Sequence, residues 1–153
     1  MRAPGGPTRT PYAPVVRAGM GLAEAKAEVA TTIDRLAGEL VAVSHEIHAR
    51  PELGYEEVFA SGRLAGALAD GGLDVEHPAF GLDTSFAARA GTAGPLAAVC
   101  CEYDALPGIG HGCAHNVIAA IGLGAGLALG PLAEPSGGRL LVLGTPALSL
   151  IHI

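Results

Sequence analysis

The sequence predicts an α/β fold with a mixed, mostly parallel sheet flanked by helices. Residues 96–101 and 139–144 are short, continuous apolar runs, which are typical of strands buried on both faces. Residues 116–129, between these runs, are apolar all round and long enough for a buried helix. A helix that connects two strands of one sheet allows the strands to run in the same direction. We therefore expect part of the sheet to be parallel.

The chain before the sheet is predicted to be largely helical. Residues 1–21 hold four prolines and show no apolar period, so we expect a flexible leader there. From residue 22 to residue 49, apolar side chains recur at steps of three and four and line one helix face. These side chains are Ile33, Leu36, Leu40, Val43 and Ile47. Pro51 ends the helix, because the residue before a proline is pushed out of the helical region.

A second helix and two short strands are expected next. Residues 56–70 place apolar side chains on one face and stop at the pair Gly71–Gly72. Residues 73–77 form a short run and residues 84–90 alternate, as strands do. The pair Glu56–Glu57 falls in the first turn of the helix, where negative charge is favoured, so we interpret it as a local helix signal.

Composition argues against several classes of function. Half of the residues are hydrophobic and 16% are charged, which supplies enough apolar material for a core. The net charge of -6 and the lack of a basic patch argue against a nucleic-acid partner. The three cysteines do not form a disulfide framework, so we expect a cytoplasmic location. The longest uncharged apolar run, residues 117–132, is interrupted by glycines and shorter than a membrane span of about 18 residues, so no membrane partner is expected.

Side chains that can bind a metal or take part in catalysis follow directly after the run at 96–101. This is the end of the strand at which α/β sheets place their ligands. Cys113 and His115 are two apart, and thiolate and imidazole both bind zinc and related divalent ions. Asp104 is suited to accept the second ring N–H of a metal-bound histidine, or it only closes the following turn. The spacing alone does not decide between a ligand pair and two unrelated residues.

Three segments together resemble the M20 metallopeptidase family, in its amidohydrolase branch. The string HEIHARPELGYEE at residues 45–57 is similar to the family's opening motif. The string EYDALPGIGHGCAHN at residues 102–116 resembles the central metal motif, and LGTPA at residues 143–147 resembles a third segment. They occur in the family's order, and the dipeptidase-like members and the aminobenzoyl-glutamate hydrolases are the most similar types.

The resemblance implies a partial zinc-exopeptidase-like catalytic domain over residues 22–147, followed by a tail, residues 148–153, that does not match the family. It implies hydrolysis of the amide bond of a small N-acyl amino acid or dipeptide, by water activated between two divalent ions, zinc or manganese. Cys113 and His115 match family metal ligands, and Asp104 matches the aspartate that supports the metal centre. Full-length relatives are expected to form homo-oligomers.

Two departures from the family pattern bear on activity. The family usually reads His-Ala-Cys-Gly-His, whereas this chain has Ala114 between its cysteine and its second histidine, and alanine lacks glycine's freedom at positive φ. The family follows Gly-Thr-Pro-Ala with two glutamates, one of which moves the proton, whereas this chain continues with Leu148 and Ser149. We therefore expect an N-terminal fragment with little or no turnover by itself.

Two other functions were considered for Cys113 and His115, and a separate question is whether His45 and His48 bind a metal. The chain is alternatively a non-catalytic metal-binding or interaction module that keeps Cys113 and His115. A cysteine nucleophile with His115 as its base is disfavoured, because neighbouring loop residues seldom reach the required geometry. His45 and His48 lie three apart on a helix face, and we interpret them as partners of the helix dipole rather than as metal ligands.

Overall fold

The computed structural model describes residues 20–149. In chain order its elements are α1 (Leu22–His48), α2 (Val58–Asp70), β1 (Asp74–Glu76), β2 (Phe86–Ala90), β3 (Leu96–Glu102), α3 (His115–Ala133) and β4 (Arg139–Thr145). The sequence predicted all seven, with ends that differ by a few residues. Most of the expected leader and most of the expected tail lie outside the described residues.

The four strands form one mixed sheet in the order β1-β2-β4-β3. Only β3 and β4 pair in parallel, with Val99 opposite Val142, and the other two pairings are antiparallel. The expectation of a mostly parallel sheet is therefore wrong. The short turn at residues 91–95 reverses the chain between β2 and β3, and α3 then carries it back so that β4 lies between them.

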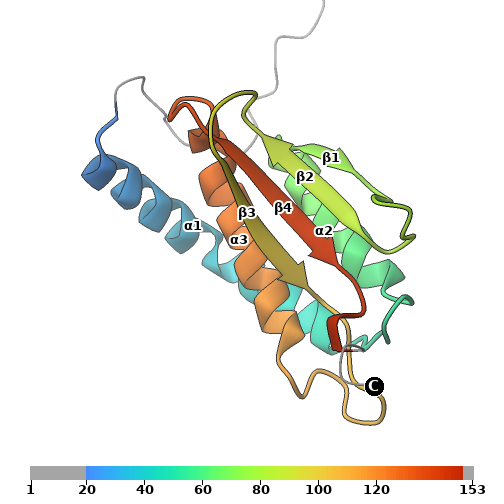
Figure 1. Cartoon of the computed structure of the whole chain (residues 1–153). Coiled ribbons are helices and arrows are strands. Elements are labelled where there is room, and N and C mark those ends of the chain that lie inside the picture. Colours follow the sequence, from blue (N-terminus) through green and yellow to red (C-terminus); the bar gives the residue numbers. More distant parts are fainter. Residues whose placement is uncertain (1–19, 150–153) are drawn as a thin grey trace, which may run out of the picture.

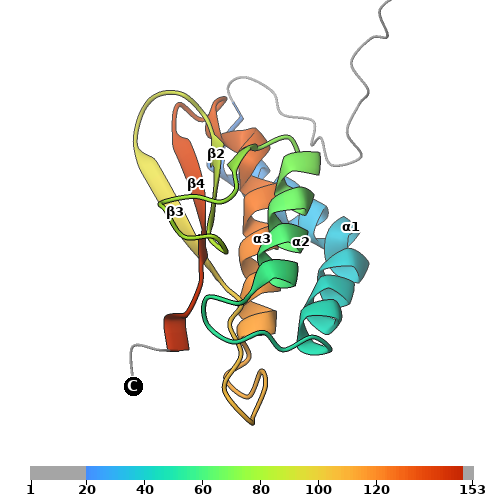
Figure 2. The same ribbon diagram turned by 90° about the vertical axis from the view of Figure 1, so that its right-hand side faces the viewer.

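The position of β3 corrects a second expectation. The run at residues 96–101 was expected to form a central strand buried on both faces, but β3 is an edge strand. Leu96 is 51% exposed, and Ala98 and Cys100 are exposed as well. The expected helices lie beside the sheet, and the three helices of residues 20–149 all cover the same face of it, as Figure 2 shows.

The core lies between the sheet and the helices. The apolar face of α1 is confirmed, since Leu36, Val43 and Ile47 are buried. α3 packs closely on the sheet because it carries glycine at the contact points: a Cβ at Gly122 would lie 2.8 Å from the sulfur of Cys101. α3 is long and apolar enough to cross a membrane, but 61% of its apolar window is buried, as in the core helix of a globular domain.

The parallel strands position the candidate site. β3 and β4 both end at the same edge of the sheet, where the loop of residues 103–114 and the segment of residues 146–149 follow them (Figure 1). Their register brings Glu102 opposite Thr145, and the Thr145 hydroxyl donates a hydrogen bond to the carbonyl of Cys101. Two loops that are about forty residues apart in sequence therefore start from fixed, neighbouring positions.

Candidate metal site at the strand ends

The centre of the site is the contact between Asp104 and His115. Asp104 lies just beyond the end of β3 and is completely buried, and His115 is the first residue of α3 and 7% exposed. Nδ1 of His115 is 2.8 Å from the carboxylate Oδ1 of Asp104 and 3.0 Å from its backbone carbonyl. Because both neighbours are acceptors, Nδ1 carries the proton and donates it. This is the contact expected of an aspartate that orients a metal-binding histidine.

The other ring nitrogen of His115 faces a second carboxylate. Nε2 lies 3.3 Å from Oε2 of Glu102, the last residue of β3. The side chain of Glu102 is 20% exposed, so this side of the imidazole is the one that solvent reaches. His115 therefore stands between two carboxylates, one buried on its Nδ1 side and one partly open on its Nε2 side.

Asp104 also ties the site to the segment after β4. Its second oxygen, Oδ2, accepts a hydrogen bond of 2.8 Å from the backbone N–H of Ser149. Burial raises the pKa of the Asp104 carboxyl, but the hydrogen bonds from Ser149 and the charge and hydrogen bond of His115 together outweigh it, so the pKa is lowered overall. Asp104 is thus kept ionised beside the imidazole.

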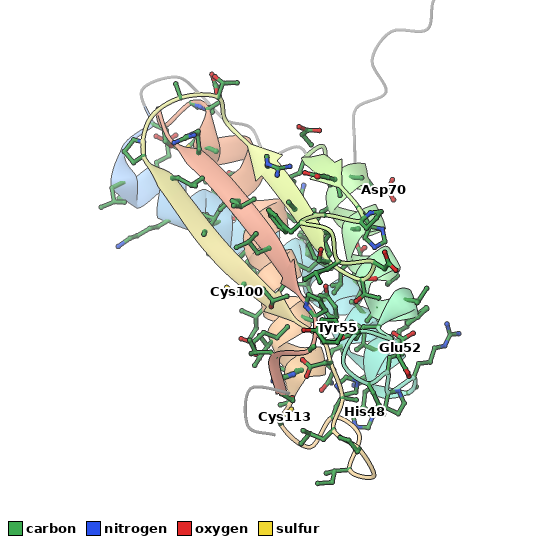
Figure 3. All side chains as sticks on the ribbon, turned by 45° about the vertical axis from the view of Figure 1, so that its right-hand side comes forward. His48, Glu52, Tyr55, Asp70, Cys100 and Cys113 are labelled. Atoms are coloured by element: carbon green, nitrogen blue, oxygen red, sulfur yellow. The ribbon has the colours of Figure 1, made fainter. Side chains whose placement is uncertain are left out.

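Cys113 borders this centre through Ser149. It is exposed, and its sulfur is 4.0 Å from the hydroxyl of Ser149, whose backbone N–H donates to Asp104. Figure 3 shows Cys113 beyond the ends of the strands, while Cys100 lies partway along β3. The third thiol, Cys101, is buried, and burial raises its pKa to about 12, so it stays protonated. Neither buried Cys101 nor Cys100 on the strand belongs to the site.

A residue that sequence reasoning missed is Glu57. It was interpreted as a helix-end charge, but its side chain is fully buried. It accepts hydrogen bonds of 2.8 Å from the hydroxyl of Thr84 and from the backbone N–H of Ala147. Burial raises the pKa of Glu57, although these hydrogen bonds oppose the shift. No signal in the sequence identifies this role, because the three partners meet only through the tertiary fold.

Tyr103 extends this buried polar layer beneath the site. It is fully buried, its hydroxyl donates a hydrogen bond of 2.6 Å to the carbonyl of Thr84, and its ring stacks on Phe86. Burial raises the pKa of the phenol, so it remains a donor. Thr84 consequently connects Tyr103 to Glu57, and the floor of the site is a hydrogen-bonded network rather than hydrocarbon.

The histidines of the opening motif lie at the end of α1, as the helix-dipole interpretation expected. His45 and His48 are both in its last turn. The ring of His48 is 6.1 Å from the ring of His111, which is buried in the loop, and burial lowers the pKa of His111. Nearby, the side-chain amide of Asn116 donates to the hydroxyl of Ser44 at 2.9 Å and so fixes the start of α3 against α1.

The donor chemistry fits one side of a metal centre. His115 has its Nδ1 anchored and its Nε2 turned toward a carboxylate, which is how a metal-binding histidine is prepared. Within residues 20–149, however, no three His, Cys, Asp or Glu side chains gather closely enough to hold an ion as they stand. The structure thus brings Asp104 and His115 together and places Cys113 beside Ser149, and the ligand roles of Cys113 and His115 stay predictions.

Ala114 shows how the sequence departure is accommodated. It occupies the left-handed region, at φ 65° and ψ 26°, immediately before α3. This is the conformation in which glycine is favoured and alanine is strained. With alanine at this position, the chain still directs His115 onto Asp104.

Comparison with known proteins places these features in a family, although no family model matches the chain. The chain is 42% identical to an Xaa-Arg dipeptidase of Mus musculus over 80% of its own length and 32% of the relative's. It is 28% identical to one subunit of the p-aminobenzoyl-glutamate hydrolase of Escherichia coli strain K12, over 68% of this chain and 26% of that one. The chain spans about a third of the length of the curated relatives that it matches.

A solved structure supports the fold. A dinuclear metal-binding peptidase of the M20 family from Bacillus subtilis superposes with a TM-score of 0.64 at 22% identity, covering 74% of this chain and 36% of that one. The resemblance seen in the three sequence motifs is thereby confirmed: the chain is homologous to the corresponding third of M20-family peptidases and amidohydrolases.

Proposed function

We propose that this chain is the metal-holding part of an M20-type hydrolase that cleaves the amide bond of small N-acyl amino acids or dipeptides. The observation that carries the proposal is the buried pair of Asp104 and His115, which leaves Nε2 of His115 turned toward the partly open side of the site. The names of the relatives, a dipeptidase and an aminobenzoyl-glutamate hydrolase, support the choice of an amide bond.

In this proposal His115 and Cys113 hold a divalent ion, zinc or manganese, and the whole enzyme uses two such ions. A bound ion supplies Lewis-acid chemistry, polarising the substrate carbonyl and lowering the pKa of water. Asp104 keeps the proton on Nδ1 of His115 and fixes the direction of the ring. For Cys113 to join His115, its side chain must turn away from Ser149, which its exposure permits.

We further propose that this chain alone turns over little substrate. Hydrolysis needs a carboxylate that moves a proton between water and the leaving amine. Glu57 is buried with both oxygens engaged, and Asp104 is engaged by His115 and Ser149. The positions after Ala147 hold Leu148 and Ser149, where the family carries two glutamates. We place the protein in the cytoplasm, in keeping with three cysteines outside any disulfide.

The test measures zinc binding and hydrolysis on the same purified chain. An Xaa-Arg dipeptide and p-aminobenzoyl-glutamate serve as substrates, with zinc or manganese added and His115→Ala as the control. We expect weak zinc binding that His115→Ala removes, and amine release no faster than in that control. Robust turnover contradicts the proposed lack of a proton-moving group, and no zinc binding contradicts the metal site itself.

The alternative function, a non-catalytic metal-binding module, is separated by the same titration. A dedicated module binds one zinc ion tightly, and Cys113→Ser then removes most of the affinity. The names of the relatives, a dipeptidase and an aminobenzoyl-glutamate hydrolase, favour the hydrolase part instead. Tight one-to-one binding without any turnover would support the module and count against the hydrolase.

A further inference from the structure

We infer that the free edge of β3 pairs with β3 of a second copy of this chain, antiparallel and about a two-fold axis at Val99. β3 is the last strand of the sheet, and Figure 1 shows no strand of residues 20–149 beyond it. The contact lies along the strand rather than at the metal site, so it is independent of the proposed function.

The backbone of β3 presents unpaired hydrogen-bonding groups on this edge. The carbonyl of Pro95 accepts a hydrogen bond from the N–H of Arg139 on β4, so the odd-numbered residues of β3 turn their backbone groups toward β4. The backbone groups of successive residues in a strand point to opposite sides. The even-numbered residues from 96 to 102 therefore turn their N–H and C=O groups outward, where no other strand of residues 20–149 meets them.

The edge also lacks the features that usually keep two edges apart. Exposed edges are commonly protected by lysine, by proline within the strand, by a bulge or by a covering element. Residues 96–101 are uncharged and contain no proline, and their pairing with β4 continues without interruption. Leu96 is 51% exposed, and Ala98 and Cys100 are exposed as well. An edge of this kind is a template for another strand.

The order of side chains makes a second copy of β3 a matching partner. Antiparallel pairing about Val99 places Ala98 opposite Cys100 of the second copy and Leu96 opposite its Glu102, so every outward backbone group of both strands is paired. Val99 then lies opposite Val99 of the second copy, and pairs of β-branched side chains stabilise a sheet. No two like charges lie opposite each other in this register.

The helix next to β3 presents an apolar face on the same side of the molecule. α3 lies against β3 where Gly122 meets Cys101, and α2 covers α3 on the side of β1 and β2 (Figure 1). α3 contains no Asp, Glu, Lys or Arg, and its Val117 and Ile121 are 46% and 63% exposed. A helix that is apolar all round is expected to be buried on every side. Pairing of the two β3 edges brings the two α3 helices together and covers this face.

The size of the contact and one pair of charges fit a weak dimer. β3 has seven residues and is therefore about 23 Å long. With a sheet layer and a helix layer of about 10 Å each, the contact covers about 460 Å² per copy and about 900 Å² in total. This is at the low end of specific interfaces, so we expect dissociation in the micromolar range. Arg139, which pairs with Leu96, lies in the same row as Glu102 of the second copy, and their opposite charges favour this register.

Sedimentation velocity of the whole chain over a dilution series tests the dimer. Ala98→Pro removes an outward N–H and no bond to β4, because proline is tolerated where the N–H of an edge strand faces solvent. We expect its dimer dissociation constant to rise at least tenfold. Ala98→Lys places a charge on the edge and is expected to act in the same direction. Ala69→Lys, the same substitution at an exposed position of α2, leaves dimerisation unchanged.

Ala98→Cys tests the register of the two strands. The introduced cysteine lies opposite Cys100 of the second copy at a Cα separation of about 5.5 Å, which a disulfide can span. We expect mild oxidation to give a covalent dimer in which peptide mapping finds this link. A covalent dimer joined only through other cysteines contradicts the register.

Two results overturn the dimer itself. A chain that stays monomeric at every concentration does so and assigns the edge to a strand of a different protein. A dimer that both Ala98→Pro and Ala98→Lys leave intact does so as well, because it uses another surface. Circular dichroism verifies the fold of each variant, and Ala98→Lys decides if Ala98→Pro does not fold. Zinc binding is measured separately, so failure of the dimer leaves the proposed function standing.

Discussion

Two buried carboxylates, those of Glu57 and Asp104, bind the backbone of the segment that follows β4. They differ in their second hydrogen-bond partner. Glu57 receives the backbone N–H of Ala147, and Asp104 receives that of Ser149. Glu57 also accepts from the neutral hydroxyl of Thr84, whereas Asp104 also accepts from the imidazole of His115. Both are completely excluded from solvent.

The difference appears in the proton affinity of the two groups. Burial raises the pKa of Glu57, while for Asp104 the hydrogen bonds of Ser149 and the interaction with His115 outweigh burial and lower the pKa. The shifts are opposite because the hydrogen bonds of Ser149 and the charge and hydrogen bond of His115 outweigh burial at Asp104. At Glu57 the hydrogen bonds do not outweigh burial, and the nearby charge of Asp104 adds to the rise. We conclude that Glu57 anchors the fold and that Asp104 prepares a histidine for a ligand, and the following changes separate these roles.

The largest effect is expected from Glu57→Ala. It leaves the Thr84 hydroxyl and the Ala147 N–H without their acceptor inside the protein, which costs about 2–4 kcal/mol of unfolding free energy. Urea denaturation measures the loss. Glu56→Ala, at the exposed neighbour, removes the same charge and is expected to change stability by less than about 0.5 kcal/mol. Equal losses in the two variants would show that Glu57 is no anchor.

Asp104→Asn tests the other carboxylate by its effect on the ligand site. The amide no longer holds the Nδ1 proton of His115 by charge, so the ring loses its fixed direction, and zinc affinity is expected to fall about 10–100-fold. Isothermal titration with zinc measures the change. The control is Asp70→Asn, at the exposed end of α2 away from the site (Figure 3), which is expected to bind zinc as before. An Asp104→Asn chain of unaltered affinity would contradict an orienting role.

Ala114→Gly sharpens the comparison on the Asp104 side. At φ 65° alanine is strained, and glycine relieves the strain, so we expect a gain of about 0.5–1 kcal/mol in unfolding free energy. Ala30→Gly, at an exposed position inside α1, is expected to lose about 1 kcal/mol, because glycine is unfavourable in a helix. Thermal or urea unfolding of both variants measures the opposite signs. A loss in both would show that the loop is not strained at Ala114.

Glu57→Gln is expected to give the smallest effect, visible as a change in pH dependence. A carboxyl whose pKa is raised by folding binds its proton more tightly in the folded chain, so the unaltered protein loses stability as pH rises above the ordinary value of 4.5 and through the folded pKa. The glutamine variant lacks this loss. As pH rises, the unfolding free energy of the glutamine variant therefore increases relative to that of the unaltered protein. This difference stops growing above the folded pKa of Glu57. A flat or opposite trend contradicts the raised pKa.

Local patterns were sufficient to predict several parts of the fold. The face of α1 follows from a regular spacing that ends in Ile47, and α3 follows from an apolar stretch rich in glycine. The place of β3 in the sheet does not follow, because a continuous apolar run such as Leu96 to Cys101 looks the same in a central strand and in an edge strand. The antiparallel direction of β2 against β4 depends on which strand returns to the middle, and no single segment encodes that.

The site was predictable to a similar degree. Asp104 was expected either to accept the second ring N–H of a metal-binding histidine or only to close a turn, and it does contact Nδ1 of His115. Cys113 is two residues from His115 in sequence, and its thiol is 4.0 Å from the hydroxyl of Ser149, a contact that no sequence pattern indicated. The buried role of Glu57 was not recognised, since it depends on Thr84 and Ala147, which the fold brings from other parts of the chain.

Nitrogen NMR of the histidine rings, before and after zinc is added, tests the central claim most directly. His115→Ala assigns the His115 signals. The account predicts that Nδ1 of His115 keeps its proton, through its bond to Asp104, while the Nε2 signal moves to the range of a metal-bound nitrogen. Signals of His115 that zinc leaves unchanged, or zinc bound at Nδ1 in place of the hydrogen bond to Asp104, would contradict it.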